Sequence, residues 1–133
     1  MIEVLLSTSR RNEFVDITEK VQKAVSKAGI KNGVCVVFVP HTTAAVTINE
    51  GADHAVAKDI RHALAALAPE DSGQYSHAEG NADAHIKASL AGSSVSVIVE
   101  KGSIVLGSWQ KIFFCEFDGP RKRKFLVQCT GSK

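Results

Sequence analysis

The chain has 133 residues, of which 44% are hydrophobic and 23% are charged. This composition excludes intrinsic disorder, a collagen-like repeat and a coiled coil, and the length suits one domain with its own core. The formal net charge is only +2 at pH 7, which is too small for a general attraction to nucleic acid or to a membrane surface. We therefore expect neither as a partner.

The N-terminus and the cysteines both indicate a reducing compartment. The chain begins with Met1, Ile2 and Glu3, without the basic start and long apolar stretch of a secretory signal, and no later run approaches the roughly 20 apolar residues of a transmembrane helix. The cysteines are odd in number and form no Cys-x-x-Cys motif. We expect a cytoplasmic protein in which these are reduced core residues: Cys35, Cys115 and Cys129.

Apolar residues that recur with helical spacing predict three helices. They are 17–28, a helix between Gly51 and Pro69, and a shorter helix between Asn81 and Gly92. Asp16 and Glu19 are the expected capping pair at the start of the first helix. The third helix is expected to carry these residues on one side: Ala82, Ile86, Ser89 and Leu90.

Short segments rich in β-branched and aromatic residues predict strands. They are 3–7, 13–16, 34–39, 44–48, 95–99, 104–106, 111–117 and 123–129. Hairpin-type turns at 100–103 and 118–120 indicate that consecutive strands pair antiparallel. Because helices and strands do not alternate regularly, we expect a single α+β domain over residues 1–133, with a mainly antiparallel β-sandwich.

One predicted strand is apolar on both of its faces. The segment 112–117 reads Ile-Phe-Phe-Cys-Glu-Phe, and successive residues of a strand point to opposite faces. One face cannot then be left to solvent. We expect its second face to be buried by another sheet or by another copy of the chain.

Three of the five histidines stand where they can take part in chemistry. His41 follows an apolar strand and precedes two hydroxyl side chains, Thr42 and Thr43, and loops at strand ends commonly carry active-site groups. His77 and His85 bracket a turn that contains glycine, and the third helix begins between them, with free amides that favour a phosphate. Three neutral imidazoles suit a zinc-type ion, but their spacing matches no standard motif. Roles as metal ligand, general acid or base, and hydrogen-bond partner all stay open.

Other polar residues have plainer alternatives. His54 and His62 lie off the apolar stripe of the second helix, so we expect both to be exposed at the surface. Glu50 and Asp53 precede that helix, and they either cap it or belong to a site. Trp109, the only tryptophan, either walls a pocket or packs.

A basic run follows the turn at 118–120. Alternation along a strand places Arg121 and Arg123 on one side and Lys122 and Lys124 on the other. A solvated edge that blocks aggregation is the simple interpretation of such a run. Arg121 is the exception, because its place next to the turn suits a planar, bidentate anion clamp.

Three separated motifs resemble the signature of the YjbQ-like family. In chain order they are His41-Thr42-Thr43-Ala44-Ala45-Val46, then His77-Ala78-Glu79-Gly80-Asn81-Ala82-Asp83-Ala84-His85, then Gly107-Ser108-Trp109-Gln110 with Phe117-Asp118-Gly119-Pro120-Arg121. The resemblance covers nearly the whole chain. It implies a small α+β protein that contains a β-sandwich and assembles as a homotrimer, with the weak thiamine-phosphate-synthase-like activity attributed to some members.

The resemblance also implies one shared pocket. The expected catalytic residues are His41, His77, His85 and Arg121, and the expected substrate-binding residues are Thr42, Thr43, Asn81, Glu50 and Trp109, with Asp53 and Glu79 as further contributors. If a divalent metal such as zinc or magnesium binds, its expected ligands are His41, His77 and His85. The expected partner is a small anionic or phosphorylated metabolite.

Two functions of different classes are compatible with these residues. The first is a thiamine-phosphate-synthase-like transferase that acts on phosphorylated heterocycles. The second is a non-catalytic module that binds a metal or an anionic metabolite. The enzyme hypothesis is weakened by the lack of a carboxylate-rich motif for a magnesium diphosphate.

Overall fold

The computed structural model describes all 133 residues. The elements follow one another as β1 (Ile2–Ser7), β2 (Glu13–Asp16), α1 (Thr18–Ala28), β3 (Asn32–Phe38), β4 (Ala44–Glu50), α2 (His54–Leu67), α3 (Ala82–Ala91), β5 (Ser94–Glu100), β6 (Ser103–Val105), β7 (Gln110–Glu116) and β8 (Lys122–Ser132). The three helices and eight strands predicted from the sequence are all present, within a few residues of their expected bounds. No helix is both long and apolar enough to span a membrane.

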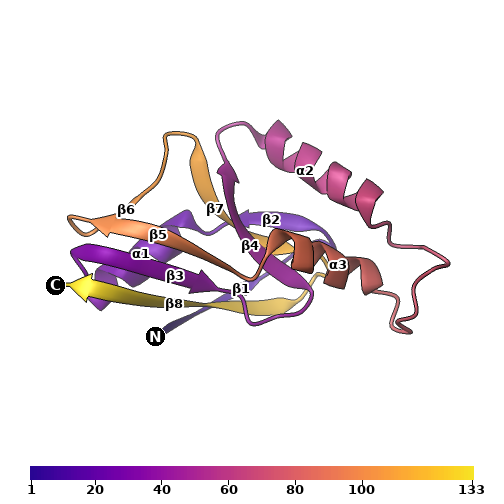
Figure 1. The fold of residues 1–133 in the computed structure, drawn as a ribbon, viewed down its shortest axis with the longest axis horizontal. Coiled ribbons are helices and arrows are strands. Elements are labelled where there is room, and N and C mark those ends of the chain that lie inside the picture. The colour runs from indigo at the N-terminus through magenta and orange to yellow at the C-terminus, as the bar shows by residue number, and fades with distance from the viewer.

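The strands form two sheets. The larger has the order β1-β8-β3-β5-β6 and the smaller has the order β2-β7-β4, and every pairing is antiparallel (Figure 1). The predicted α+β class with mainly antiparallel sheets is confirmed. The hairpin predicted at 100–103 joins the paired strands β5 and β6. The hairpin predicted at 118–120 is wrong: β7 belongs to the smaller sheet and β8 to the larger, so this turn carries the chain from one sheet to the other.

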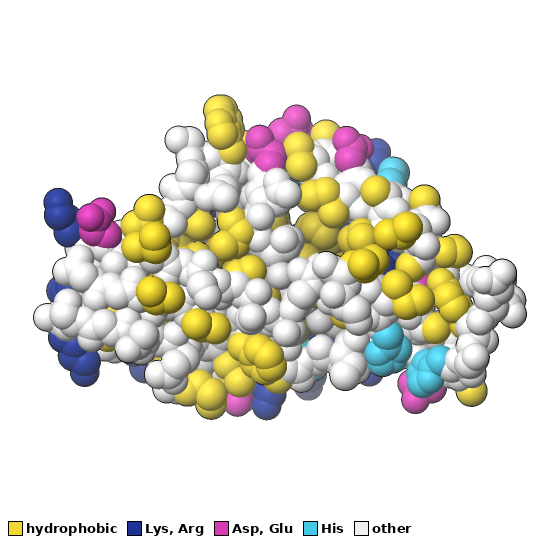
Figure 2. Space-filling view, viewed as in Figure 1, with side chains coloured by type: hydrophobic (Ala, Val, Ile, Leu, Met, Phe, Trp, Pro, Cys, Tyr) yellow, Lys and Arg dark blue, Asp and Glu magenta, His cyan; other side chains and the backbone are white.

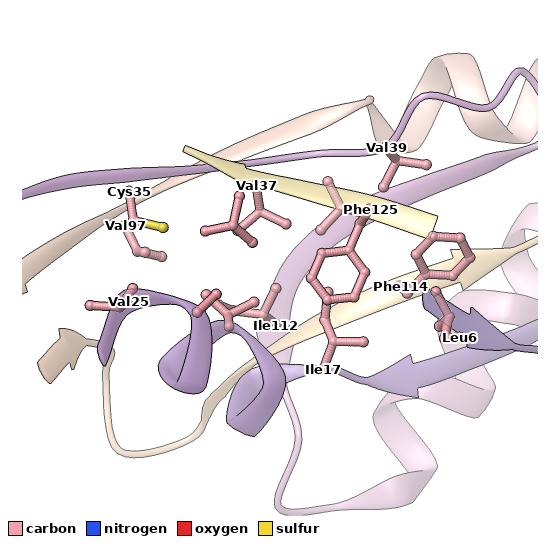
Figure 3. Packing of buried hydrophobic residues seen from close by; sticks show 14 of the residues in the cluster. Leu6, Ile17, Val25, Cys35, Val37, Val39, Val97, Ile112, Phe114 and Phe125 are labelled. Atoms are coloured by element: carbon pink, nitrogen blue, oxygen red, sulfur yellow. The ribbon is translucent and has the colours of Figure 1, made fainter. Parts of the chain in front are cut away.

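The main core lies between the two sheets and is closed by α1. Ile112 and Phe114 of β7 share one buried cluster with Val37 and Phe125 of the larger sheet. Figure 3 shows Val25 of α1 across this layer from the larger sheet. The inner face of the larger sheet is therefore covered partly by the smaller sheet and partly by α1.

The second face of β7 is covered by helices of the same chain. Phe113, Cys115 and Phe117 form a second buried cluster with Ala84 and Ala88 of α3, and a leucine of α2 packs against it. The prediction that neither face is solvated is confirmed. The expectation of another sheet or another copy on the second face is wrong, because α2 and α3 bury it.

The start of α1 differs from the prediction. Ile17 is the N-cap and supplies no side-chain cap, while the carboxylate of Asp16 accepts from the backbone N–H of Thr18 at 3.0 Å. The expected reciprocal pair of Asp16 with Glu19 is therefore absent. Ile17 is fully buried, so packing of this residue fixes the point at which the helix begins.

The face of α3 that packs inward also differs from the prediction. Ile86 and Leu90 are exposed, whereas Asp83 and Lys87 are buried. The Lys87 ammonium nitrogen lies 3.0 Å from a carboxylate oxygen of Asp83. Because the two charges neutralise each other, both side chains can be buried. Apolar periodicity alone selects the wrong face here because the inner face carries an ion pair.

Core packing at Phe114 gives a stability prediction. Phe114 is 0% exposed, whereas Trp109 in the loop before β7 is 66% exposed. We expect Phe114→Ala to lower the free energy of unfolding by about 3–5 kcal/mol, because it removes buried aromatic surface and leaves a cavity. Trp109→Ala is the matched aromatic control and should change it by less than about 0.5 kcal/mol. Urea unfolding of both variants measures the difference, and equal losses would contradict this account of the core.

Candidate functional site

The residues expected from the motifs meet in one polar pocket. A cavity of about 430 Å³ is lined by Pro40, His41, Thr42, Thr43, His77, Glu79, Asn81, His85, Asp118, Arg121 and Arg123. Apart from the proline, every lining side chain is polar or charged. Histidine side chains gather at this end of the molecule, beside the loop that leads into α3 (Figure 2). A second cavity of about 410 Å³ shares His41, Thr42 and His85 and extends along α3.

His41 is held at the point where the β3–β8 ladder stops. Every second residue of an antiparallel strand directs its backbone groups toward the same neighbour. Phe38 pairs with Leu126 of β8 in this way. The next residue of the chain that could bond to β8 is Pro40, which has no N–H to donate. The ring of His41 occupies this place: the backbone N–H of Lys124 donates to Nε2 at 3.1 Å, and the Lys124 carbonyl oxygen lies 3.1 Å from the same nitrogen. Nδ1 is the ring nitrogen left for a ligand.

The electrostatic surroundings of His41 favour its neutral form. Burial lowers the pKa of His41, and the positive charge of Arg123 lowers it further, while the backbone contact with Lys124 and the charge of Glu116 oppose this only in part. A neutral imidazole can act as hydrogen-bond partner, base or metal ligand near neutral pH.

His77 and His85 lie side by side. Their ring centroids are 5.2 Å apart and the rings are nearly perpendicular. His77 comes from the loop after α2, and its Nε2 is 3.9 Å from a carboxylate oxygen of Glu79. His85 is in the first turn and a half of α3, so the pair stands beside the amino end of that helix.

Arg121 is oriented by Asp118. Its Nε donates to the Asp118 carbonyl oxygen at 2.8 Å and its Nη2 donates to the Asp118 carboxylate at 2.9 Å, which leaves Nη1 for a ligand. The same carboxylate accepts from Nδ2 of Asn81 at 2.8 Å. Burial alone raises the pKa of Asp118, but the hydrogen bonds from Asn81 and Arg121 and the charges of Arg121 and Arg11 outweigh burial and lower it.

Arg123 lines the pocket and is paired with the buried carboxylate of Glu116. Nε and Nη2 of Arg123 donate to the two carboxylate oxygens of Glu116, and Nη2 also donates to the hydroxyl of Thr43 at 2.9 Å. The side chains of this ion pair are 5% and 0% exposed. Burial raises the pKa of Glu116, but the hydrogen bonds from Arg123, Thr8 and the Asp118 amide and the charge of Arg123 outweigh burial and lower it.

Charged side chains outside the pocket lining connect its parts through further ion pairs. Arg11, in the loop between β1 and β2, donates to Asp118 at 3.3 Å and to Asp83 of α3 at 3.0 Å. Asp83 also accepts from the buried ammonium of Lys87 at 3.0 Å. These contacts tie the turn after β7 to α3, the two elements that carry Arg121 and His85.

Several candidates lie outside this pocket. Glu50 accepts from the backbone N–H groups of Ala52 and Asp53, and Asp53 caps α2, so capping explains both carboxylates. Trp109 is largely exposed in the loop before β7. The structure therefore does not bring Glu50, Asp53 or Trp109 to the histidines. His54 and His62 are exposed on α2, as predicted.

Sequence reasoning missed the residues that orient the site. Asp118 and Asp83 lie within the motifs but nothing local marks them as partners of Arg121 and Arg11, and no motif includes Glu116 or Arg11. One signal for Arg123 was available, because strand alternation already placed it on the same side as Arg121. Its burial against Glu116 depends on a long-range contact that local patterns do not reveal.

The three histidines do not form a metal site within the chain. No group of three or more His, Cys, Asp or Glu side chains is arranged to hold a metal ion. Lys124 engages Nε2 of His41, and only His77 and His85 lie ring to ring. Within the chain, the three imidazoles are therefore not arranged as one metal centre.

The Glu116–Arg123 pair predicts a pH-dependent stability. Because the folded pKa of Glu116 lies below its ordinary value of 4.5, its contribution is complete above that value and is lost as the pH falls through the folded pKa. Glu116→Gln leaves Arg123 without its counter-ion and should lower the free energy of unfolding at pH 7 by about 3 kcal/mol. The variant should also lose less stability than the wild type when the pH falls from about 6 to about 3.

Thermal unfolding across this pH range measures both effects. Glu3→Gln is the matched control, because its partner Lys124 is 3.6 Å away and both side chains are nearly half exposed. It should change the free energy of unfolding by less than about 1 kcal/mol. A Glu116→Gln protein as stable as this control would refute the assigned role of the buried pair.

Comparisons with known proteins agree with the motif resemblance. The family model described as UPF0047 protein YjbQ-like matches residues 2–132. A UPF0047 protein of Methanocaldococcus jannaschii is 49% identical over 96% of this chain and 92% of its own length, and the UPF0047 protein YugU of Bacillus subtilis is 44% identical over 95% and 96%.

A solved structure extends this agreement to three dimensions. An uncharacterized conserved protein of the YjbQ/UPF0047 family from Clostridium acetobutylicum is 52% identical and superposes with a TM-score of 0.95, covering 98% of this chain and 100% of its own. The matches cover nearly the whole chain in both sequence and fold, so this chain belongs to the YjbQ/UPF0047 family.

Proposed function

We propose that the pocket binds the phosphorylated end of a small metabolite and that the chain acts as a thiamine-phosphate-synthase-like transferase on phosphorylated heterocycles. The observation that carries this proposal is the meeting of Arg121, the amino end of α3 and the His77–His85 pair in one polar cavity. Arginine and helix N-termini both favour phosphate oxygens, and an imidazole beside them can exchange a proton with a leaving group.

The anion-binding part of the proposal depends on uncommitted donors. Two nitrogens of Arg121, Nε and Nη2, donate to Asp118, which holds the guanidinium in place. The third nitrogen, Nη1, stays free to donate to a ligand. The side chain of Asn81, the residue before α3, donates to Asp118 instead of capping the helix. The amino end of α3 therefore has no side-chain cap, and the proposal places the anion at this end of the helix.

The proposed reaction assigns a role to each end of the pocket. In thiamine phosphate synthesis a pyrimidine methyl diphosphate loses pyrophosphate, and the ring nitrogen of a thiazole phosphate then attacks the resulting carbocation. Arg121 would hold the departing pyrophosphate, where charge develops. His85 would act as the proton donor to that group, and the neutral His41 would position the substrate by a hydrogen bond.

Three variants test the transferase proposal. We expect His85→Ala and Arg121→Ala to reduce thiamine phosphate formation by about a hundredfold or more, because each removes a group that acts on the developing charge. Lys122→Ala is the control: Lys122 is exposed and absent from the pocket, and its removal should leave the rate unchanged. Product formation from the two phosphorylated precursors is measured for each variant at confirmed fold and mass. Wild-type rates in both pocket variants would refute the proposal.

The second candidate function is binding of an anionic metabolite or a metal without catalysis. Arg121 pairs with Asp118 and Arg123 pairs with Glu116. Because both arginines are already neutralised, the pocket has less free positive charge to stabilise a departing pyrophosphate, and this favours the binding function. Only Glu79 remains as a carboxylate without a cationic side-chain partner besides His77. Zinc and magnesium content of protein purified without chelator, together with calorimetric titration of pyrophosphate, distinguishes this function: bound ligand with no turnover would favour it.

We also propose that the chain assembles as a homotrimer in the cytoplasm. The outer face of the larger sheet exposes apolar side chains from four strands: Leu5, Val34, Val36, Phe38, Ile98 and Val105. Exposed apolar faces of this kind mark interaction surfaces. Light scattering should give about three times the chain mass of 14.2 kDa. Phe38→Glu should lower this mass, and a monomeric wild type at micromolar concentration would contradict the proposal.

A further inference from the structure

Two of the three free cysteines face each other across neighbouring strands. Cys35 of β3 is directly opposite Cys129 of β8 in the larger sheet, and neither forms a disulfide. The third, Cys115 of β7, faces Phe14 on one side and Ala45 on the other. Cys35 and Cys129 are therefore the two thiols that the strand register places opposite each other, and Cys115 has no cysteine opposite it.

The register places this pair at the closer type of antiparallel position. The N–H of Val39 donates to the carbonyl oxygen of Ser93, in line with the β3–β5 register, so Val37 and Cys35 also direct their backbone groups toward β5. Toward β8, Cys35 and Cys129 then form a non-hydrogen-bonded pair. The Cα atoms of such a pair are about 4.5 Å apart, which lies within the disulfide range of about 4.4–6.8 Å.

Both side chains lie on the core side of the sheet. Cys35 is 0% exposed and belongs to the main core, and the half-buried Cys129 packs against the same core. Figure 3 shows the sulfur of Cys35 within this layer. At this position β3 is paired on both edges, Cys35 with Cys129 and with Val97, while β8 is paired with β3 from Leu126 to Ser132. The sheet therefore fixes the separation of the two cysteines.

We propose that Cys35 and Cys129 are a redox modification site that closes into a cross-strand disulfide when the protein is exposed to hydrogen peroxide. The Cys129 thiol releases its proton to solvent, and the thiolate attacks hydrogen peroxide: a sulfenic acid forms, the O–O bond breaks, and the departing hydroxide takes a proton from solvent and leaves as water. The Cys35 sulfur then attacks the Cys129 sulfur, forming the S–S bond while the S–O bond breaks. The Cys35 proton leaves with that oxygen as a second water. Two thiols are oxidised and one peroxide is reduced.

The order of these two steps follows from exposure. Cys129 is the more accessible sulfur. Burial raises the pKa of Cys35 to about 12, with a smaller contribution from contact with Cys129. Cys35 is therefore not the thiol that ionises first, and it reacts second by passing its proton to the sulfenic oxygen as its sulfur attacks. The bond would join β3, which ends three residues before His41, to β8, which begins at Lys122 beside Arg123, at a site that does not depend on the proposed function of the pocket.

Mass spectrometry of the peroxide-treated protein tests the proposal. We expect the intact mass to fall by about 2 Da, and alkylation in denaturant to find one thiol instead of three. Proteolysis should give a peptide that links Cys35 to Cys129, and dithiothreitol should restore all three thiols. The midpoint of thermal unfolding should rise by about 5 °C or more on oxidation.

Two variants separate the expected pair from other oxidation. Cys115→Ala keeps the pair and should still lose about 2 Da, whereas Cys129→Ser should not. Three results would overturn the proposal: a disulfide that involves Cys115, a product linked between two chains, or a wild-type protein that gains oxygen without forming the link. The peptide map of the wild type decides among these even if a variant fails to fold.

Discussion

The buried ion pair of Glu116 with Arg123 joins the two sheets at the end where the pocket lies. Glu116 is the last residue of β7 and Arg123 is the second residue of β8, so the pair connects the smaller sheet to the larger one. Two charges withdrawn from water need every remaining polar site satisfied. Thr8, Thr43 and the backbone amides after Glu116 supply these hydrogen bonds. The ion pair thereby fixes the path of the turn that presents Asp118 and Arg121.

A row of alternating charges extends this constraint to α3. Asp118 meets Arg11, Arg11 meets Asp83, and Asp83 meets Lys87. The helix is therefore placed against the turn by directed polar contacts as well as by Ala84 and Ala88 on the apolar cluster. Because the pocket has almost no apolar lining, its shape depends on these contacts. The same network holds Arg121 and the paired imidazoles of His77 and His85 at a fixed separation.

The sequence predicts the elements better than it predicts their partners. Alternation correctly identified β7 as buried on both faces, yet it contained no information on whether α3 or a second chain covers Phe113. On α3, Ile86 and Leu90 have the expected spacing but face outward, since the buried Asp83 and Lys87 compensate each other. The motifs correctly predict that the three histidines and Arg121 line one pocket. Trp109 belongs to the third motif and Glu50 follows the first, yet both lie outside that pocket. Residues distant in sequence complete the site, and local patterns cannot locate them.

The compensated charges reconcile the small net charge of the chain with the proposed binding of a phosphate. Arg121 and Arg123 each face a carboxylate, so the pocket has little long-range attraction for anions. Its remaining donors are Nη1 of Arg121, the first amides of α3 and the imidazoles, and each of these is directional. Fixed donors distinguish ligands by the positions of their oxygens, whereas net charge attracts any anion. A pocket of this kind selects a ligand by shape, and its selectivity depends on how rigidly Asp118 and Glu116 hold the two arginines.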